Sequence, residues 1–265
     1  ALRGQGGSKS DHCLWVAIME AFVASSSRRS FCNDLGLSYE RMVEAESSQV
    51  QLLRGLRSLG FQKEEADCNA GDWRVVRAAV VAGLYPQVAK VERPPLRFAD
   101  SLAGAIQVNS NAREIRYWIK DEMDESNRGA SKPPRLRAFL HPSSLLFKEN
   151  SYSCPYVMYS DKTVQQQSNP KHPTKLVLTG CSEASVYALL LFGGDLQVDH
   201  QEAEVAVDFW ASFAGGSTTV VAMVQRLRAA IDRLLLRKVE RPSESLAKDP
   251  VAECVVTLLT TDGLG

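Results

Sequence analysis

The sequence predicts an α+β protein in which helices come first, short strands follow and a helix ends the chain. Apolar residues recur at helical spacing before residue 87, then alternate as in β-strands, and return to helical spacing after residue 218. The 265 residues suffice for a buried core, and 31 basic residues balance 31 acidic ones. This balance excludes a basic tail or an acidic disordered tract.

A Gly-rich linker, residues 1–9, precedes an all-helical unit over residues 10–86. Polar residues with capping side chains open the first and third helices, and glycine stops the second and third. The three expected helices run from Ser10 to an interruption at Ser25–Ser30, from Ser38 to Gly60, and from Asp72 to Gly83. The residues of the second helix expected to face inward are Tyr39, Val43, Val50, Leu53 and Leu56.

Residues 87–218 show the pattern of a β domain. Short strands with polar, Gly/Pro-containing connections favour a small barrel of the oligonucleotide-binding (OB) kind over a sandwich, although the pattern alone does not separate the two. The expected strands are Val88–Glu92, Glu114–Ile119, Arg137–Leu140, Tyr156–Tyr159, Lys175–Leu178 and Val205–Phe213. Residues 93–134 contain two Pro-Pro pairs and an acidic cluster, which predict an insertion, and residues 165–173 predict a loop.

Residues 219–265 predict a helical extension. An apolar stripe of helical period continues to Glu240, where Arg241-Pro242 ends it. A last short helix is expected over Val251–Leu259.

The apolar runs and the cysteines indicate an intracellular protein. The run Tyr187–Phe192 is far shorter than the roughly 18 to 20 residues that a membrane-spanning helix needs, and no signal peptide opens the chain. The six cysteines lie far apart without a Cys-x-x-Cys pair, so we expect reduced, mostly buried thiols and no zinc site. The chain opens on Ala1 instead of Met, and we interpret it as a segment of a longer protein.

No catalytic or nucleotide-binding motif is found in this segment. The Gly-rich opening lacks the Gly-Lys pair of a Walker phosphate loop and follows no strand. The adjacent His12 and Cys13 would point about 100° apart on a helix, so they make a poor catalytic dyad. Gly193-Gly194 is favoured as a tight turn, in which backbone approaches backbone, over a ligand loop. We therefore expect this segment alone to be neither an enzyme nor a cofactor carrier.

Positive charge is concentrated in one part of the β domain. Histidine, serine, threonine and tyrosine are interleaved with these cations, a mixture that can hold a phosphate backbone and offer donors and stacking faces to unpaired bases. An ordinary solvated surface explains the composition equally well. The basic residues are Arg135, Arg137, Lys148, Lys162, Lys171 and Lys175, against the acids Glu149 and Asp161.

Four segments carry a family resemblance: Ser8–His12, Arg77–Ala89, His141–Ser144 and Tyr187–Asp195. In this order they resemble the C-terminal accessory region of DExH/DEAH-box RNA helicases, especially the subgroup that acts on structured RNA. The resemblance covers nearly the whole chain, and four ordered motifs are more specific than any one of them.

The resemblance implies a helical ratchet-like domain over residues 10–86, an OB-fold-like domain over 87–218 with an insertion at 93–134, and a C-terminal helical extension over 219–265. In the family, the first two domains pack against the motor lobes and close a tunnel for single-stranded RNA. The motor lobes are absent from this chain. ATP and Mg are therefore implied for the parent helicase and not for this segment.

The resemblance and the basic composition place RNA contacts in the same β segment. The expected nucleic-acid-binding residues are hydrogen-bond donors at a strand end, two phosphate-binding lysines and one tyrosine. They are His141, Ser143 and Ser144, then Lys90 and Lys162, and Tyr159, whose ring is either a stacking platform or part of the core.

The predicted function is that of an RNA-binding accessory module of an ATP-dependent RNA helicase. Its partners would be single-stranded or structured RNA and the motor lobes of the parent chain, with no membrane. The alternative is a motor-less structural or protein-interaction module within a large ribonucleoprotein complex, with the acidic insertion as a docking arm.

Overall fold

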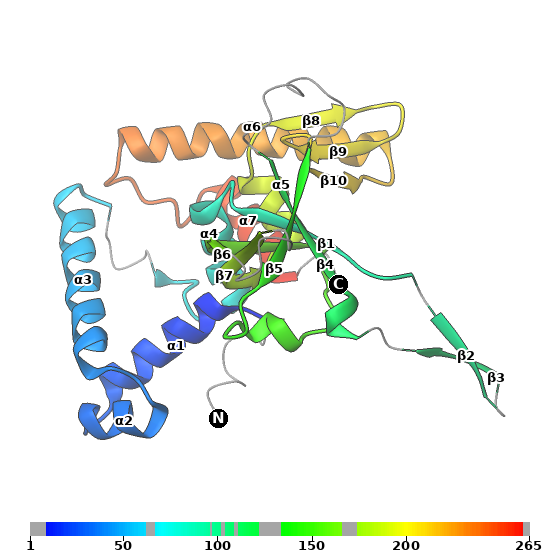
Figure 1. Ribbon diagram of the computed structural model, residues 1–265. Helices are drawn as coiled ribbons and strands as arrows, with labels where there is room; N and C mark the ends of the chain where they lie inside the picture. Colours follow the sequence, from blue (N-terminus) through cyan, green and yellow to red (C-terminus); the bar gives the residue numbers. More distant parts are fainter. Residues whose placement is uncertain are drawn as a thin grey trace. The chain divides into compact units, whose positions relative to one another are not determined.

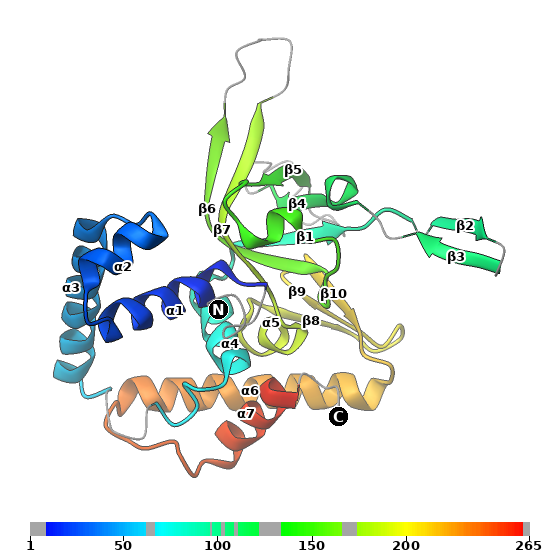
Figure 2. The same ribbon diagram turned by 90° about the horizontal axis from the view of Figure 1, so that it is seen from below.

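The computed structural model describes residues 9–61, 67–95, 97–101, 104–108, 111–121, 134–165 and 174–261 (Figures 1 and 2). Residues 1–8 of the linker and most of the acidic cluster lie outside the described residues. The chain divides into two compact units. The first contains Cys13–Val76 and Leu227–Gly265, and the second contains Lys9–His12 and Arg77–Arg226.

The predicted helices of the first 86 residues are present. They are α1 (Asp11–Ala24), α3 (Tyr39–Ser58) and α4 (Trp73–Leu84), and the structure adds α2 (Arg28–Leu35). The Ser38 hydroxyl accepts a hydrogen bond from the Arg41 amide and caps α3, as expected of a serine at this position. Phe22 is fully buried, with the rings of Phe31 and Tyr39 centred 6.3 and 6.2 Å from its own.

The prediction that the apolar residues of α3 face inward is wrong for Val43, Val50 and Leu56. No residue of α3 is buried, and Val43, Val50 and Leu56 are 38 to 46% exposed. Helical spacing identifies residues that share a face, but it carries no information on whether another element covers that face. Gly83 also lies inside α4, because the helix continues to Leu84, and its φ is not positive.

Five strands of the second unit close into a barrel. They are β1 (Val88–Glu92), β4 (Arg116–Lys120), β5 (Arg135–Leu140), β6 (Tyr156–Gln165) and β7 (Lys175–Glu183). Their order around the barrel is β1-β4-β5-β7-β6, and only the β5–β7 pair is parallel. A single 3-10 turn, η5 (Leu145–Lys148), lies between β5 and β6 in the chain. This is the five-stranded barrel topology of the OB-fold, so the predicted small barrel is confirmed.

Alternation along the strands places one side chain in two inside the barrel. The core contains Ala89, Val91, Tyr117, Ile119, Ala138, Leu140, Leu146, Val157, Tyr159 and Leu178. The residues between them on β4 and β5 therefore face outward.

The segment predicted as an insertion contains further strands. β2 (Arg97–Ser101) and β3 (Gly104–Val108) pair in an antiparallel sheet of their own, and η3 (Ala112–Glu114) leads directly into β4.

The prediction of one strand over Val205–Phe213 is wrong, because this segment is a hairpin. β9 (Glu204–Val207) and β10 (Ala211–Ala214) pair with each other, and β8 (Leu196–Asp199) completes the sheet. The turn between β9 and β10 contains Asp208 and Phe209, with φ of 50° and 55°. Positive φ at both central positions is typical of a tight hairpin turn. An Asp-Phe pair does not predict such a turn from the sequence, whereas an Asn-Gly pair would.

The apolar run before the paired glycines forms α5 (Val186–Phe192), in which four residues are buried. The tight turn predicted after it is confirmed, because a Cβ on Gly193 would lie 2.4 Å from the Leu189 carbonyl oxygen. At the C-terminal end, α6 (Thr218–Glu240) and α7 (Pro250–Thr261) confirm the helical extension.

Within the described residues, no helix is both long and apolar enough to cross a membrane. All six cysteines are free thiols; Cys68 and Cys254 are exposed and the other four are buried.

Candidate nucleic-acid interface

The predicted donors His141 and Ser143 lie at the end of β5. The His141 amide donates to the Leu178 carbonyl at 2.9 Å, which extends the β5–β7 pairing by one residue. The Ser143 amide donates to His141 Nδ1 at 3.2 Å, so this ring nitrogen is an acceptor. In the neutral ring the proton is therefore on Nε2, and both side chains remain accessible at the surface.

Ser144, the third predicted donor, has a role within the fold. Its side chain is 7% exposed, and its hydroxyl accepts from the Leu146 amide as the N-cap of η5. The same hydroxyl bonds to the Cys181 thiol, whose pKa is raised to about 12 by burial and by the Asp11 carboxylate. Ser144 thus positions the loop that carries His141.

The structure separates the remaining predicted residues. Lys90 is half-buried on the outer side of β1, where its neighbours across the strands are Trp118 and Tyr156. Lys162 is exposed on β6. Tyr159 is 5% exposed and belongs to the barrel core, so of the two roles considered for its ring the structure shows the core one.

The segment Ser10–His12 holds the start of α1 against β6 and β7. Ser10 Oγ lies 2.7 Å from Ser182 Oγ, and the His12 ring nitrogens lie 2.6 and 2.7 Å from the hydroxyls of Ser182 and Ser160. The buried Asp11 carboxylate accepts from the backbone amides of Leu145 and Cys181, at 2.8 and 2.7 Å. This segment therefore also fixes the loop after β5.

Stability is expected to fall at acidic pH because of His12. Burial lowers the pKa of its imidazole from the ordinary 6.5, although the Asp11 carboxylate raises it. Because the folded-state pKa lies below the unfolded one, the contribution of His12 is present above pH 6.5 and is lost as the pH falls through the folded-state pKa. Urea unfolding of the wild type and of His12→Gln across this range measures the effect. Identical pH dependences of the two proteins would contradict it.

A basic face covers the outside of β4 and β5. We define it by the outward-facing residues of these strands and the first residue of β7. They are Arg116, Trp118, Lys120, Arg135, Arg137, Phe139 and Lys175. This face combines five cations with two aromatic rings, and it coincides with the strand 2–3 surface through which OB-folds bind oligonucleotides.

Cations and rings alternate along the basic face. The guanidinium carbons of Arg135 and Arg137 lie 4.5 and 5.6 Å from the Trp118 ring centre. Arg137 and Lys175 lie 5.2 and 5.6 Å from the centre of Phe139. A guanidinium stacked on a ring is held flat and presents its other plane outward, which suits it to phosphates and bases.

The guanidinium of Arg137 lies near other charged groups of this face. Partial burial and the nearby Arg116 lower the pKa of its guanidinium, while Glu92 opposes the shift. Among the described residues, no carboxylate forms an ion pair with Arg135, Arg137 or Lys175. An anion that binds here would relieve the repulsion between the two arginines.

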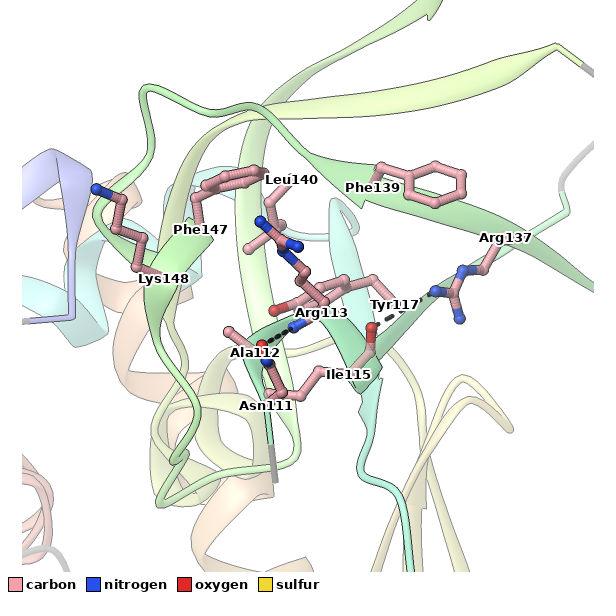
Figure 3. A pocket seen from close by; sticks show the side chains of 10 residues that line it. All are labelled: Asn111, Ala112, Arg113, Ile115, Tyr117, Arg137, Phe139, Leu140, Phe147 and Lys148. Carbon is pink, nitrogen blue, oxygen red and sulfur yellow. Dashed lines mark hydrogen bonds between the residues drawn. The ribbon is translucent and has the colours of Figure 1, made fainter. Parts of the chain in front are cut away.

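A cavity of about 430 Å³ opens beside the basic face, between η3, β4, β5 and η5 (Figure 3). Arg137 and Phe139 line it on one side, and Phe147 and Lys148 on the other. The Arg113 side chain extends into the space between them.

Sequence reasoning counted Arg135, Arg137 and Lys175 as basic residues but did not single them out, and it missed Trp118 and Phe139. The signal was present in β5, where Arg135, Arg137 and Phe139 alternate with Leu136, Ala138 and Leu140. Such alternation places the first three on one face.

Two known families match the chain. Residues 76–196 match the family described as Oligonucleotide/oligosaccharide-binding (OB)-fold, which spans the barrel. Residues 204–261 match the family described as C-terminal domain in RNA helicases, which spans the β9–β10 hairpin, α6 and α7.

Relatives resemble most of this chain. A putative DEAH-box ATP-dependent helicase of Mycosarcoma maydis is 25% identical over 94% of the chain. The putative ATP-dependent RNA helicase DHX57 of Homo sapiens is 28% identical over 89%, and the ATP-dependent DNA/RNA helicase DHX36 of Homo sapiens is 23% identical over 89%. The chain spans 16, 16 and 21% of the lengths of these three proteins.

The OB-fold match over the barrel, the helicase C-terminal match that follows it and the helicase relatives over 89 to 94% of the chain agree with one another. The chain is therefore similar to the C-terminal region of DExH/DEAH-box RNA helicases.

Proposed function

We propose that this chain is the RNA-binding accessory module of an ATP-dependent RNA helicase, and that single-stranded RNA crosses the basic face. The observation that carries the proposal is the alternation of Arg135, Trp118, Arg137, Phe139 and Lys175 on the outside of the barrel. Cations neutralise phosphates, and flat groups stack with unpaired bases, which is how OB-folds hold single strands.

In this proposal, residues 10–86 act as the ratchet-like domain and residues 219–265 as a helical extension, while ATP and Mg act at the motor lobes of the parent chain. Lys162 would then be peripheral, whereas Lys90 borders the basic face, because it lies opposite Trp118 in the β1–β4 register. His141 and Ser143, with their accessible polar groups, would contact the strand at the end of β5.

Arg137→Gln is expected to weaken RNA binding about fivefold and to make the slope of log affinity against log salt less negative by about 0.7, the share of one single-strand phosphate contact. The measurement is fluorescence anisotropy of a labelled oligouridine of about ten nucleotides, within the site size of OB-folds, titrated with the whole chain at several salt concentrations. Lys90→Gln tests the residue predicted from sequence in the same assay.

Arg226→Gln is the matched control, because it removes one exposed arginine from α6, outside the basic face. A salt slope near zero in the wild type, or equal losses from Arg137→Gln and Arg226→Gln, would rule the proposal out.

A second candidate function is that of a protein-interaction module, and α3 favours it. Its apolar residues Val50, Leu52 and Leu56 are 41 to 71% exposed, which is costly on a surface that meets only water. RNA-stimulated ATP hydrolysis by the parent protein distinguishes the two, because a motor-less scaffold would show none.

A further inference from the structure

The cavity beside the basic face has an unusual lining. The phenyl rings of Phe139 and Phe147 are 37 and 44% exposed, although burying a phenyl ring is favourable. Leu140 and Tyr117 form part of the remaining lining and belong to the barrel core, so the cavity has a fixed apolar wall. Its volume of about 430 Å³ is within the range of small-molecule sites.

The charged lining of this cavity has one sign. Arg113, Arg137 and Lys148 contribute three cations, and no carboxylate is among the residues that line it. An apolar wall with exposed rings accepts a flat, weakly polar group, whereas the cations accept an anion. A nucleotide has both parts, with a base to stack and a phosphate to pair.

A second cavity indicates that the bound anion is one phosphate of a nucleic-acid strand. It encloses about 390 Å³, and Arg113 and Arg137 line both cavities. Arg93 and Arg116 complete its four cations, which outnumber the two carboxylates in its lining, Glu92 and Glu114. Arg113 and Arg137 therefore stand at the boundary between the cavities. Phosphates on either side of a bound nucleotide can follow this arginine-lined path, which a free mononucleotide would leave empty.

We propose that the first cavity takes one unstacked base of a single-stranded RNA, with its ring against Phe147 and its adjoining phosphate at Arg113 and Arg137. This base site rests on the proposed function and deepens it. The basic face supplies contacts that any phosphate backbone satisfies, and the cavity adds a contact that requires a base.

The test is a double-mutant cycle between Phe147 and the bases of the RNA. The whole chain is titrated with labelled oligouridine and with an abasic ribose-phosphate oligomer of equal length, as wild type and as Phe147→Ala. We expect Phe147→Ala to weaken binding of oligouridine about tenfold and binding of the abasic oligomer less than twofold. Phe147→Leu keeps the apolar volume of the side chain but lacks the ring. It is expected to weaken oligouridine binding as much as Phe147→Ala does, and it controls for a folding defect caused by the smaller alanine.

Phe209→Ala is the matched control, because Phe209 is 61% exposed in the β9–β10 turn and lines neither cavity. If Phe147→Ala weakens both oligomers equally, or neither, while Arg137→Gln still weakens oligouridine binding, the base site is wrong and the RNA-binding function stands. If the wild type binds neither oligomer, the proposed function fails and the base site fails with it.

Discussion

Replacing Asp11 with alanine is expected to lower the free energy of unfolding by about 3 kcal/mol, because it leaves the buried Cys181 amide and the partly buried Leu145 amide without an acceptor, at about 2 and 1 kcal/mol. The carboxylate is 5% exposed, and its two oxygens accept separately from the amides of Leu145 and Cys181. One amide belongs to the turn after β5 and the other to β7, so the loss loosens the barrel where the His141 loop begins. Urea denaturation of the whole chain measures the change.

Asp11→Asn is the control for this prediction. Its side chain retains one carbonyl oxygen, so one of the two amides keeps an acceptor, and about half of the loss is expected. A loss below about 1 kcal/mol for the alanine variant would show that water or a neighbouring group replaces the carboxylate. The prediction would then be wrong.

Helix positions could be predicted from the sequence because local chemistry determines them. Ser38 caps α3 through its own hydroxyl, and the Asp72 carboxylate accepts from the Arg74 amide at the start of α4. Such signals lie within a few residues of the helix end. The α2 helix could not be predicted, because its eight residues contain only three apolar side chains, which are too few to establish a helical period.

Features that depend on distant residues could not be predicted. The exposure of α3 depends on what packs against it, and the β9–β10 turn depends on two residues without a strong preference for positive φ. The barrel was predictable in kind, since five short strands with polar connections favour it, but the pairing of β5 with β7 joins segments about forty residues apart.

The residues of the candidate site could likewise be predicted only in part from the sequence. Local composition correctly marked the β segment as basic, and the strand period would have placed Arg135 and Arg137 on one face. Trp118 could not be added from the sequence, because it reaches these arginines only through the β4–β5 register, in which it lies opposite Arg137. The strand-end motif His141–Ser144 predicts that Ser144 donates to RNA, whereas in the structure Ser144 is buried and caps η5.

The Gly193→Ala variant is expected to lose about 3 kcal/mol of unfolding free energy, the upper part of the usual range for overpacking. The added methyl would lie 2.4 Å from the Leu189 carbonyl oxygen and 2.7 Å from Val207 Cγ1. The first of these atoms is backbone of α5 itself and cannot turn away, and the second is a side chain of β9, so relief requires the end of α5 to distort and Val207 to move. The backbone of Gly193, with φ of −68° and ψ of −173°, is open to alanine, and the whole cost is therefore steric.

Gly83→Ala provides the opposite control. A Cβ at this position meets nothing within 4 Å, and the residue lies inside α4, where alanine is favoured over glycine by about 0.5 to 1 kcal/mol. The two substitutions add the same methyl group and are expected to shift the urea midpoint in opposite directions. If Gly193→Ala is tolerated as well as Gly83→Ala, then α5 does not pack tightly against β9. The paired glycines would then serve some purpose other than the close approach of backbone to backbone.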